Sequence, residues 1–413
     1  MEAYLFTFMR YLTIFCTACL FISCNNKLHE NYLPEAVQTI LVDLDNAVDL
    51  HMSDFFSEIN YYPLITPEGK KMGRITKTMI LDEYIGFYDD ARKSVWVFTR
   101  DFDYVNEVRI PIGRGPGEVI HMTDAILTND GLIHALGAYN VVIYNLEGEF
   151  MDEFLVDFFI TKFTYNQETQ EYIGYASNNL NRELNEGHAG HNLIFFDKTG
   201  TVTGSKLPIE NGRQYIAQYI PNRFAAYNDN ELISPALIDT VYSIHNGSIE
   251  PRYYLDFGDA SIPENVFTLR RNYGSNEYDW ANFFSMEIDD KNYIGFLSMF
   301  NETDSFIHFR FGTRQQNYNA IYNKETEEIK IGSGRMVNDI DYGFVHFNYQ
   351  SFDNTLFTLV EPIDLLHHLD NLHENEPEKL QSSKMKILTE LSDTITADGN
   401  PILKIAAFKT VGH

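Results

Sequence analysis

Apolar and polar residues alternate in short runs along most of this chain, and this two-residue periodicity is typical of β-strands. The stretch 84–101 is representative: Tyr84, Phe87 and Tyr88 belong to one run, DDARKS forms a polar turn, and the run 95–98 follows. The chain also contains 26 Tyr and 31 Phe, which are residues that favour strands. The pattern therefore predicts an all-β body of many short strands joined by tight turns.

The strand pattern repeats with a nearly constant period. In each unit an aromatic or aliphatic residue ends a strand just before a polar hairpin tip, as a tight hairpin requires. These anchor residues are Phe98, Tyr144, Phe196, Ile244 and Tyr322. They are 46, 52, 48 and 78 residues apart, and a period near 50 is typical of propeller blades or a solenoid. The long last interval predicts an insertion over residues 259–280.

Six repeat units can be counted along the chain. Their ranges are 76–120, 121–157, 158–213, 214–258, 281–332 and 337–362. The last unit is short of strands, and the N-terminal runs 36–46 and 57–66 have no unit of their own. A propeller has to close its ring, because otherwise it leaves raw sheet edges. We therefore predict a six-bladed β-propeller over residues 36–362, in which the N-terminal strand or strands complete the last blade.

Residues 363–413 depart from the strand pattern. Apolar residues at three- and four-residue steps predict two helices over residues 363–393, with Pro377 in the favoured first turn of the second. Residues 400–409 then have the pattern of a strand. We expect a small C-terminal helical appendage that packs on the propeller, with the final strand added to its sheet.

The first 23 residues have the features of a bacterial export signal. Arg10 precedes an uncharged run over residues 11–23, which is shorter than the roughly 20 residues that span a bilayer but fits a secretory signal. The run ends in FISC, which resembles a lipobox, so Cys24 is the predicted lipidation site and residues 24–35 are the tether. Phe21 departs from the usual Leu, and an ordinary signal with an incidental cysteine is the alternative. Lipid on Cys24 would anchor the body to the cell envelope, and the outer membrane is the expected site. Whether the body faces the periplasm or the outside is left open by the sequence.

The charge balance and the cysteines exclude several kinds of partner and site. The chain has 31 Lys+Arg against 59 Asp+Glu, a formal net charge of −28, so its surface repels nucleic acid and anionic lipid. We expect no nucleic-acid partner, and membrane contact through the lipid anchor alone. All three cysteines lie within residues 16–24, which excludes disulfides and cysteine metal sites from the body.

Several segments resemble the six-bladed β-propeller lipoproteins of Bacteroidota, which are TolB-like and distantly NHL-like. The matching pieces are Cys24 in its lipobox, YYPLIT (61–66), GRGPGE (113–118), VVIYNLEGEF (141–150), DTVYSI (239–244) with PRYYLDFG (251–258), and NPIL (400–403). They cover most of the mature chain in the right order, and GRGPGE followed by a strand unit is the most specific piece. The resemblance implies the propeller fold. It implies little about function, because that family mostly lacks a defined biochemical activity.

The glycine-rich loop GRGPGE raises the question of a phosphate site. A P-loop needs Lys followed by Ser or Thr, and a dinucleotide-binding turn needs glycines that open a helix. Here the glycines stand at 113, 115 and 117, and a strand–turn–strand pattern follows them. We therefore interpret the loop as a corner between two blades, where glycine permits a positive φ angle.

No cofactor or metal is expected from the remaining motifs. His188 and His191 could supply two zinc ligands, but zinc usually takes three or four. The histidines of 367–373 lie on the wet face of a predicted helix, and the acidic run 43–54 lacks the Gly and the closing Glu of a calcium loop. HExxH and GxSxG are absent. No catalytic pair can be chosen among the many carboxylates from sequence alone.

Three aromatic residues in polar loop sequence are candidate ligand-binding residues: Tyr273, Tyr278 and Trp280. Exposed Tyr and Trp side chains can stack on the apolar face of a sugar ring. The alternative is that they fill the packing between blades, as most Tyr and Phe residues of such a fold do.

A propeller without a recognisable catalytic motif favours a non-catalytic binding or scaffold module, whose ligand is a glycan, a peptide or a protein. The alternative is an envelope glycan hydrolase or lyase that uses carboxylates or histidine at the propeller axis. A converging cluster of Asp, Glu, His or Arg at one mouth of the channel would favour the enzyme. A mouth lined by aromatic and neutral polar groups would favour binding.

Overall fold

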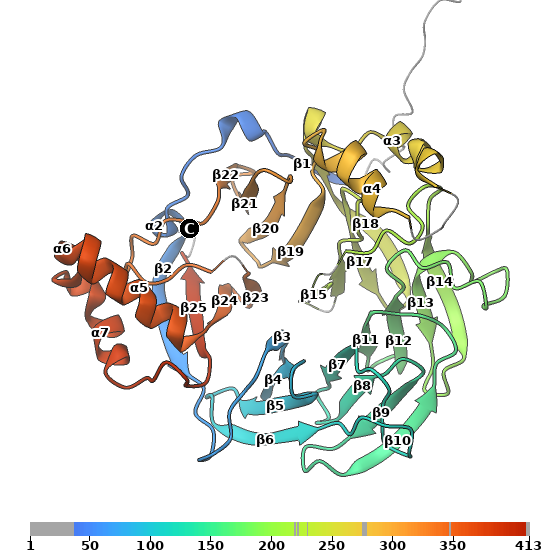
Figure 1. Cartoon of the computed structure of the whole chain (residues 1–413), viewed down its shortest axis with the longest axis horizontal. Helices are drawn as coiled ribbons and strands as arrows, with labels where there is room; N and C mark the ends of the chain where they lie inside the picture. Colours follow the sequence, from blue (N-terminus) through green and yellow to red (C-terminus); the bar gives the residue numbers. More distant parts are fainter. Residues whose placement is uncertain are drawn as a thin grey trace, which may run out of the picture. The chain divides into compact units, whose positions relative to one another are not determined.

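The computed structural model describes residues 37–218, 220, 223–228, 230–274, 279–346 and 348–409, and the strands of these residues form six β-sheets. The expected signal 1–23, the lipidation site Cys24 and the tether 24–35 lie outside the described residues. Residues 38–413 belong to one unit, in which the sheets follow one another around a common centre (Figure 1). We number the sheets I to VI in the order in which the first antiparallel hairpin of each sheet occurs along the chain.

Sheets I, II and III each take four consecutive strands of the chain. Sheet I contains β3 (Ile75–Ile80), β4 (Tyr84–Asp89), β5 (Ser94–Thr99) and β6 (Tyr104–Arg109). Sheet II contains β7 (Asp124–Leu127), β8 (Ile133–Leu136), β9 (Asn140–Tyr144) and β10 (Phe150–Leu155). Sheet III contains β11 (Lys162–Asn166), β12 (Glu171–Tyr175), β13 (His191–Phe196) and β14 (Val202–Pro208). Neighbouring strands pair antiparallel, so each sheet is a simple meander.

Sheets IV and V repeat the meander, and sheet IV has one additional strand. Sheet IV contains β15 (Phe224–Tyr227), β16 (Asn230–Ile233), β17 (Thr240–His245), β18 (Ser248–Asp256) and β1 (Gln38–Leu41). Sheet V contains β19 (Phe296–Glu302), β20 (Phe306–Gly312), β21 (Asn317–Asn323) and β22 (Ile329–Ser333). We expected the N-terminal strand or strands to complete the last blade; β2 does join the last sheet, whereas β1 pairs in parallel with β18. This position covers the edge of β18 and buries Ile40 in the apolar cluster between sheets IV and V.

Sheet VI joins the two ends of the described chain. Its strands are β23 (Gln350–Phe352), β24 (Thr355–Val360), β25 (Ile402–Phe408) and β2 (Phe56–Pro63). The N-terminal strand β2 pairs antiparallel with β25 over its whole length, from Phe56 opposite Phe408 to Pro63 opposite Ile402. Strands from residues about 340 positions apart in sequence therefore share one sheet.

The helices near the C-terminus lie between two strands of sheet VI, and the final strand joins this sheet as expected. They are α5 (Pro362–Asn375), α6 (Pro377–Leu380), η5 (Ser383–Met385) and α7 (Lys386–Ser392), and β25 follows them. The chain leaves the sheet after Val360 and returns at Ile402, and the helices bury Leu365, Leu372 and Leu388 against these two positions. No helix in the described part of the chain is long and apolar enough to cross a membrane.

Short helical elements occupy two further places. The insertion between sheets IV and V contains η2 (Gly258–Ala260), α3 (Glu264–Thr268), η3 (Leu269–Tyr273), α4 (Ala281–Phe284) and η4 (Ser285–Asp289). This insertion extends past the expected end at residue 280. Near the N-terminus, η1 (Leu44–Asn46) and α2 (Met52–Phe55) lead from β1 to β2.

Aromatic side chains fill the space between neighbouring sheets. Phe154 of β10 reaches from sheet II to Tyr172 and Phe196 of sheet III, with ring centroids 5.3 and 6.4 Å apart. Tyr172 and Phe196 stack on each other at 5.1 Å. Such contacts bury large apolar areas and explain why the chain is so rich in Tyr and Phe.

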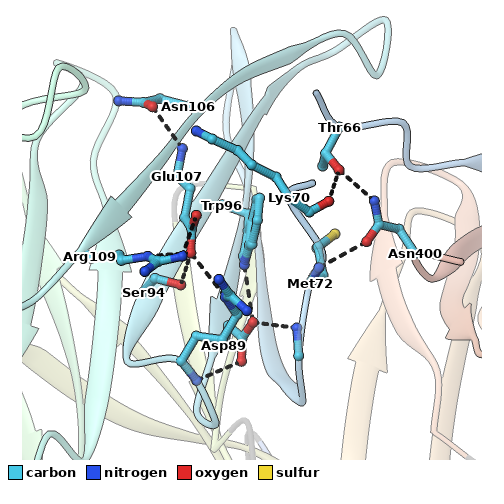
Figure 2. Close-up of polar contacts among 12 residues, drawn as sticks. Thr66, Lys70, Met72, Asp89, Ser94, Trp96, Asn106, Glu107, Arg109 and Asn400 are labelled. Atoms are coloured by element: carbon cyan, nitrogen blue, oxygen red, sulfur yellow. Dashed lines mark hydrogen bonds and ion pairs between the residues drawn. The ribbon is translucent and has the colours of Figure 1, made fainter. Parts of the chain in front are cut away.

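Polar contacts connect sheet VI to sheet I, as Figure 2 shows. The Asn400 side chain, just before β25, donates to Thr66 Oγ1 (2.7 Å) and accepts from the Met72 backbone N–H (2.8 Å). In sheet I, the buried Asp89 carboxylate accepts from the Trp96 indole N–H at 3.1 Å and from two backbone N–H groups. The segments YYPLIT and NPIL, which carry part of the family resemblance, therefore contact each other where sheet VI meets sheet I.

Two buried histidines should make the fold sensitive to acid. Burial lowers the pKa of His134 and of His308 to about 4, below the ordinary value of 6.5. Between these values the unfolded chain binds more protons than the folded one, so stability falls as the pH drops from 7.5 to 5. Each histidine accounts for about 2 kcal/mol of this loss. The expected result for His134→Phe is lower stability at pH 7.5, but an acid-induced loss that is about 2 kcal/mol smaller than in the wild type.

Urea unfolding at pH 7.5 and 5.0 measures this prediction. Other titrating groups contribute equally to both proteins, including Asp239, whose pKa burial raises to about 6. They cancel in the comparison. An unchanged pH dependence in His134→Phe would show that His134 does not titrate as described.

Candidate functional site

A cavity of about 710 Å³ lies where the six sheets meet. Each sheet lines the cavity with its first strand or with the residues just before that strand. The first strands stand nearest the centre in Figure 1. One lining residue from each sheet, I to VI, is Lys77, Thr123, Lys162, Arg223, Met299 and Gln350. A volume of this size suits a small organic ligand or a short oligosaccharide.

Two sheets present the same pair of residues to the cavity. On β3, Lys77 stands opposite Tyr88 of β4, and on β11, Lys162 stands opposite Tyr175 of β12. All four residues line the cavity. Both lysines are 7% exposed, because side chains of the first strand point into the centre of the fold, where neighbouring sheets surround them.

One carboxylate lies between the two lysines. Lys77 Nζ is 3.0 Å from Asp124 Oδ2, and Lys162 Nζ is 3.5 Å from Asp124 Oδ1. Asp124 is fully buried, and its Oδ2 also accepts the Phe163 backbone N–H at 3.1 Å. Burial lowers the pKa of Lys77, and neighbouring Lys162 lowers it further, while Asp124 opposes both effects.

Arg223 places a third cation in the cavity wall. Its guanidinium is 4% exposed and donates to the backbone oxygens of Ser234 (2.8 Å) and Gln218 (3.3 Å). It lies over the Tyr175 ring, 5.2 Å from the centroid. The partners that the structure gives this side chain are therefore carbonyls and an aromatic face, and burial lowers its pKa.

The rim of the cavity carries acidic groups. Asp90 forms ion pairs with Arg74 and with Lys93, which hold its pKa below the usual value against the effect of burial. Glu361 and Asp364 are exposed, and partial desolvation together with the Asp364 carboxylate raises the pKa of Glu361. Charged groups of both signs therefore line this mouth together with neutral polar groups, so our sequence criterion does not choose between enzyme and binding protein by itself.

The loop GRGPGE joins β6 of sheet I to β7 of sheet II, as expected of a corner between sheets. Its amides face carboxylates: the Gly115 N–H donates to Glu118 Oε2 at 2.7 Å, and the Gly117 N–H donates to Glu153 Oε2 at 2.9 Å. The Tyr144 hydroxyl donates to the Gly117 carbonyl at 2.6 Å. Acidic side chains thus occupy the positions that a phosphate would need, and the loop is not arranged to bind one.

Gly117→Ala should destabilise the protein more than the same change at Gly148. Gly117 has φ +76°, and an added Cβ would lie 2.9 Å from the Phe150 ring and 3.0 Å from the Tyr144 hydroxyl. Gly148 has φ +84° with no atom within 4 Å of the added Cβ. Backbone strain alone costs about 1–2 kcal/mol at Gly148. Strain and overpacking together cost about 2–4 kcal/mol at Gly117, as chemical denaturation would measure. Equal losses at the two positions would contradict the packing argument.

The aromatic candidates of the insertion lie in a small apolar cluster. Tyr273 packs edge-on against Phe283 at 5.7 Å and bonds to Glu287, and Trp280 packs edge-on against Phe284 at 6.2 Å. Neither residue lines the central cavity. Tyr278 lies outside the described residues. A role for these residues in sugar stacking stays a prediction.

The candidate histidines form hydrogen bonds within the protein, and Asp54 of the acidic run pairs with Lys330. His188 Nδ1 lies 3.1 Å from Ser205 Oγ, His191 contacts backbone carbonyls, and His368 Nε2 lies 2.8 Å from the Tyr342 carbonyl. In the part of the chain that the structure describes, no three His, Cys, Asp or Glu residues form a group that could hold a metal ion.

Sequence reasoning did not single out Lys77, Lys162, Asp124 or Arg223. They are separated by 38 to 146 positions and come together because the sheets share a centre. One signal was available: a lysine at an inward position of a strand, as in ITKTMI, is uncommon, because lysine is almost never fully buried without a partner.

Comparison with known proteins supports the architecture. The family profile described as Domain of unknown function (DUF4934) matches residues 37–407. A candidate exported protein of Bacteroides fragilis NCTC 9343 superposes with a TM-score of 0.69 at 16% identity, covering 90% of this chain and 100% of that one. At this identity the likeness concerns the fold alone.

Two further solved structures are more distant. A DUF4221 family member from Bacteroides vulgatus ATCC 8482 has a TM-score of 0.47 at 10% identity, with 88% of this chain and 98% of that chain covered. The WD40 domain of Neurospora crassa Pan2 has a TM-score of 0.38 at 10% identity, with 77% and 82% covered. Among curated proteins, no sequence matches this chain.

Proposed function

The chain belongs to the DUF4934 family, and we propose that it is an exported, lipid-tethered six-bladed β-propeller that binds a ligand in its central cavity without transforming it. The observation that carries this proposal is the cavity of about 710 Å³, to which all six sheets contribute lining residues. In this proposal sheets I to VI are the blades, and β2 completes the last one by pairing with β25.

The ion pairs of Asp124 and Asp90 at the cavity support binding over catalysis. A general acid or base needs a carboxyl that is free to exchange a proton with the substrate. Asp124 is buried between two lysines, and Asp90 is paired with Arg74 and Lys93. Both carboxylates are therefore committed to ion pairs.

Export and anchoring are the second part of the proposal. We assign residues 1–23 as the signal and Cys24 as the lipidated residue, which would hold the propeller at the bacterial envelope, at the outer membrane. The likeness to a candidate exported protein of Bacteroides fragilis supports this assignment. Cys24→Ser should move the protein from the membrane fraction to the soluble fraction, and retention in the membrane would contradict the assignment.

An envelope glycan hydrolase or lyase is the second candidate function. It is favoured by His346, Glu361 and Asp364, which line the same cavity, and by the raised pKa of Glu361, which suits a proton donor. Glu361→Gln would then abolish turnover and leave binding intact.

One experiment separates the two functions. The fragment 25–413, which contains the whole unit Gln38–His413, is applied to an array of bacterial, host and dietary glycans, and every hit is examined for products. Binding that leaves the glycan intact supports the binding module, and cleavage supports the enzyme. If no glycan binds, a pull-down from envelope extract tests a peptide or protein ligand. If that ligand still binds when a bulky residue fills the cavity at Thr123, the cavity is not the binding site.

A further inference from the structure

We propose that the ligand of the central cavity carries an oxyanion group, a carboxylate, sulfate or phosphate, and that Lys77, Lys162 and Arg223 bind this group. The inference rests on the proposed function, because it names the chemistry of the ligand that the same cavity takes. It goes beyond that function by assigning three residues and the sign of the ligand's charge.

The first argument is the charge balance of the cavity wall. Lys77, Lys162 and Arg223 are each more than nine-tenths buried and all line the cavity. Asp124 is the carboxylate that pairs with both lysines. Glu231 is also close to Lys77, and its side chain accepts from Thr164, while burial raises its pKa. Among the described residues, these three cations thus face the two carboxylates of Asp124 and Glu231.

The second argument is the environment of Arg223. An arginine is always protonated, so a buried guanidinium needs a counter-charge to offset the cost of its desolvation. Arg223 forms no ion pair with any carboxylate in the described part of the chain. Its side chain lies over Tyr175, which stands opposite Lys162, so the unmatched charge is next to the lysine pair. A bound oxyanion would supply the missing counter-charge.

The third argument is the contrast with the rest of the protein. The chain has nearly two acidic residues for every basic one, so a cationic wall is not a consequence of its composition. The acids of this region stand at the rim: Asp90 is paired, and Glu361 and Asp364 are exposed to solvent, which screens them. The cations lie deeper, where the lower dielectric strengthens their attraction for an anion.

Calorimetry with a matched series of probes tests the inference on the mature chain. The probes are glucuronate and sulfate as oxyanions, with glucose as the neutral and glucosamine as the cationic counterpart of glucuronate. We expect at least one oxyanion probe to bind at least tenfold more tightly than glucose, and glucosamine to bind no better than glucose. Equal affinity for glucose and both oxyanions, or no binding of either oxyanion, would overturn the inference.

Variants assign the site. Arg223→Met and the double variant Lys77→Met/Lys162→Met should each weaken oxyanion binding at least tenfold. Arg223→Lys, which keeps the charge, should retain most of the affinity. Lys330→Met removes a lysine that pairs with Asp54 at an exposed position outside the cavity, and it should change nothing. Equal affinities of the cavity variants and the Lys330 variant would contradict the assignment.

Asp124→Asn tests the inference with a variant that should strengthen oxyanion binding instead of weakening it. Removing this carboxylate takes away the negative charge that competes with a bound oxyanion for the two lysines, so the variant should bind the oxyanion probes more tightly than the wild type. If the lysine–aspartate cluster served only the stability of the fold, Asp124→Asn would not increase the affinity for the oxyanion probes. If a neutral glycan found on the array binds in the cavity while neither oxyanion does, the proposed function stands and this inference fails.

Discussion

Asp124→Asn is expected to lower the free energy of unfolding by about 3–5 kcal/mol, because it leaves two buried lysines without their counter-charge. The asparagine has nearly the same size and keeps an oxygen that can accept the Phe163 N–H, so the change isolates the charge. Lys77 and Lys162 are both 7% exposed, so little of either side chain is in contact with bulk water. Urea unfolding at pH 7.5 would measure the loss.

The pH dependence of the variant identifies the cause of this loss. Without Asp124, the pKa of Lys77 in the folded state falls further below the value of 10.5 that applies to an unfolded chain. The unfolded state then binds more protons, so the stability of the variant should rise as the pH increases from 7.5 to 9.5. A loss caused by altered packing would not recover with pH.

Two further variants serve as controls for Asp124→Asn. Asp398→Asn breaks an ion pair with Lys71 in which both side chains are more than half exposed, and it should cost less than about 1 kcal/mol. The triple variant Lys77→Met/Lys162→Met/Asp124→Asn removes all three charges and should recover most of the stability. If Asp124→Asn and Asp398→Asn cost the same, the cluster is not buried as the structure describes it.

Local sequence signals were sufficient to anticipate the strands and their grouping. The two-residue alternation marks each strand, and the polar tips after Phe98, Tyr144 and Phe196 mark the hairpins between the third and fourth strands of sheets I to III. These features are set by neighbouring residues, so they are visible in one dimension. The same reasoning placed an N-terminal strand in the last sheet, where β2 lies. Its pairing with the final strand β25 was not predicted.

Features that depend on distant contacts were not visible in the sequence. The pattern of β1 fits any open sheet edge, and only the burial of Ile40 against sheet V selects the edge of β18. The convergence of the cavity cations was missed for the same reason, because a lysine or arginine in each of three separate sheets carries no local sign that the three lie close together. The glycine loop was interpretable because its missing Lys and its following strand are local facts, although the carboxylates of Glu118 and Glu153 at its amides were not foreseen.

Phe408→Ala is expected to destabilise the protein by about 3–5 kcal/mol, because it opens a cavity where the two ends of the described chain meet. Phe408 ends β25, is 4% exposed, and stacks on Phe306 of sheet V with ring centroids 4.5 Å apart. On its other side lies Phe56 of β2, at 4.6 Å. The three rings therefore hold the N-terminal strand, the C-terminal strand and the neighbouring sheet in one apolar cluster.

The position of Phe408 also predicts which backbone amides should lose protection from hydrogen exchange in Phe408→Ala. Truncating the ring removes contacts of β2 and β25, so backbone amides of β2 should exchange with solvent faster, while those of sheet II should be protected as before. Phe159→Ala, at a phenylalanine that is 48% exposed, controls for the loss of an aromatic ring and should change stability by no more than about 0.5 kcal/mol. Uniformly faster exchange across sheets II and VI would mean that the sheets unfold as one unit. In that case the pairing of β2 with β25 would not open independently of the other sheets. It would be lost only when the whole body unfolds cooperatively.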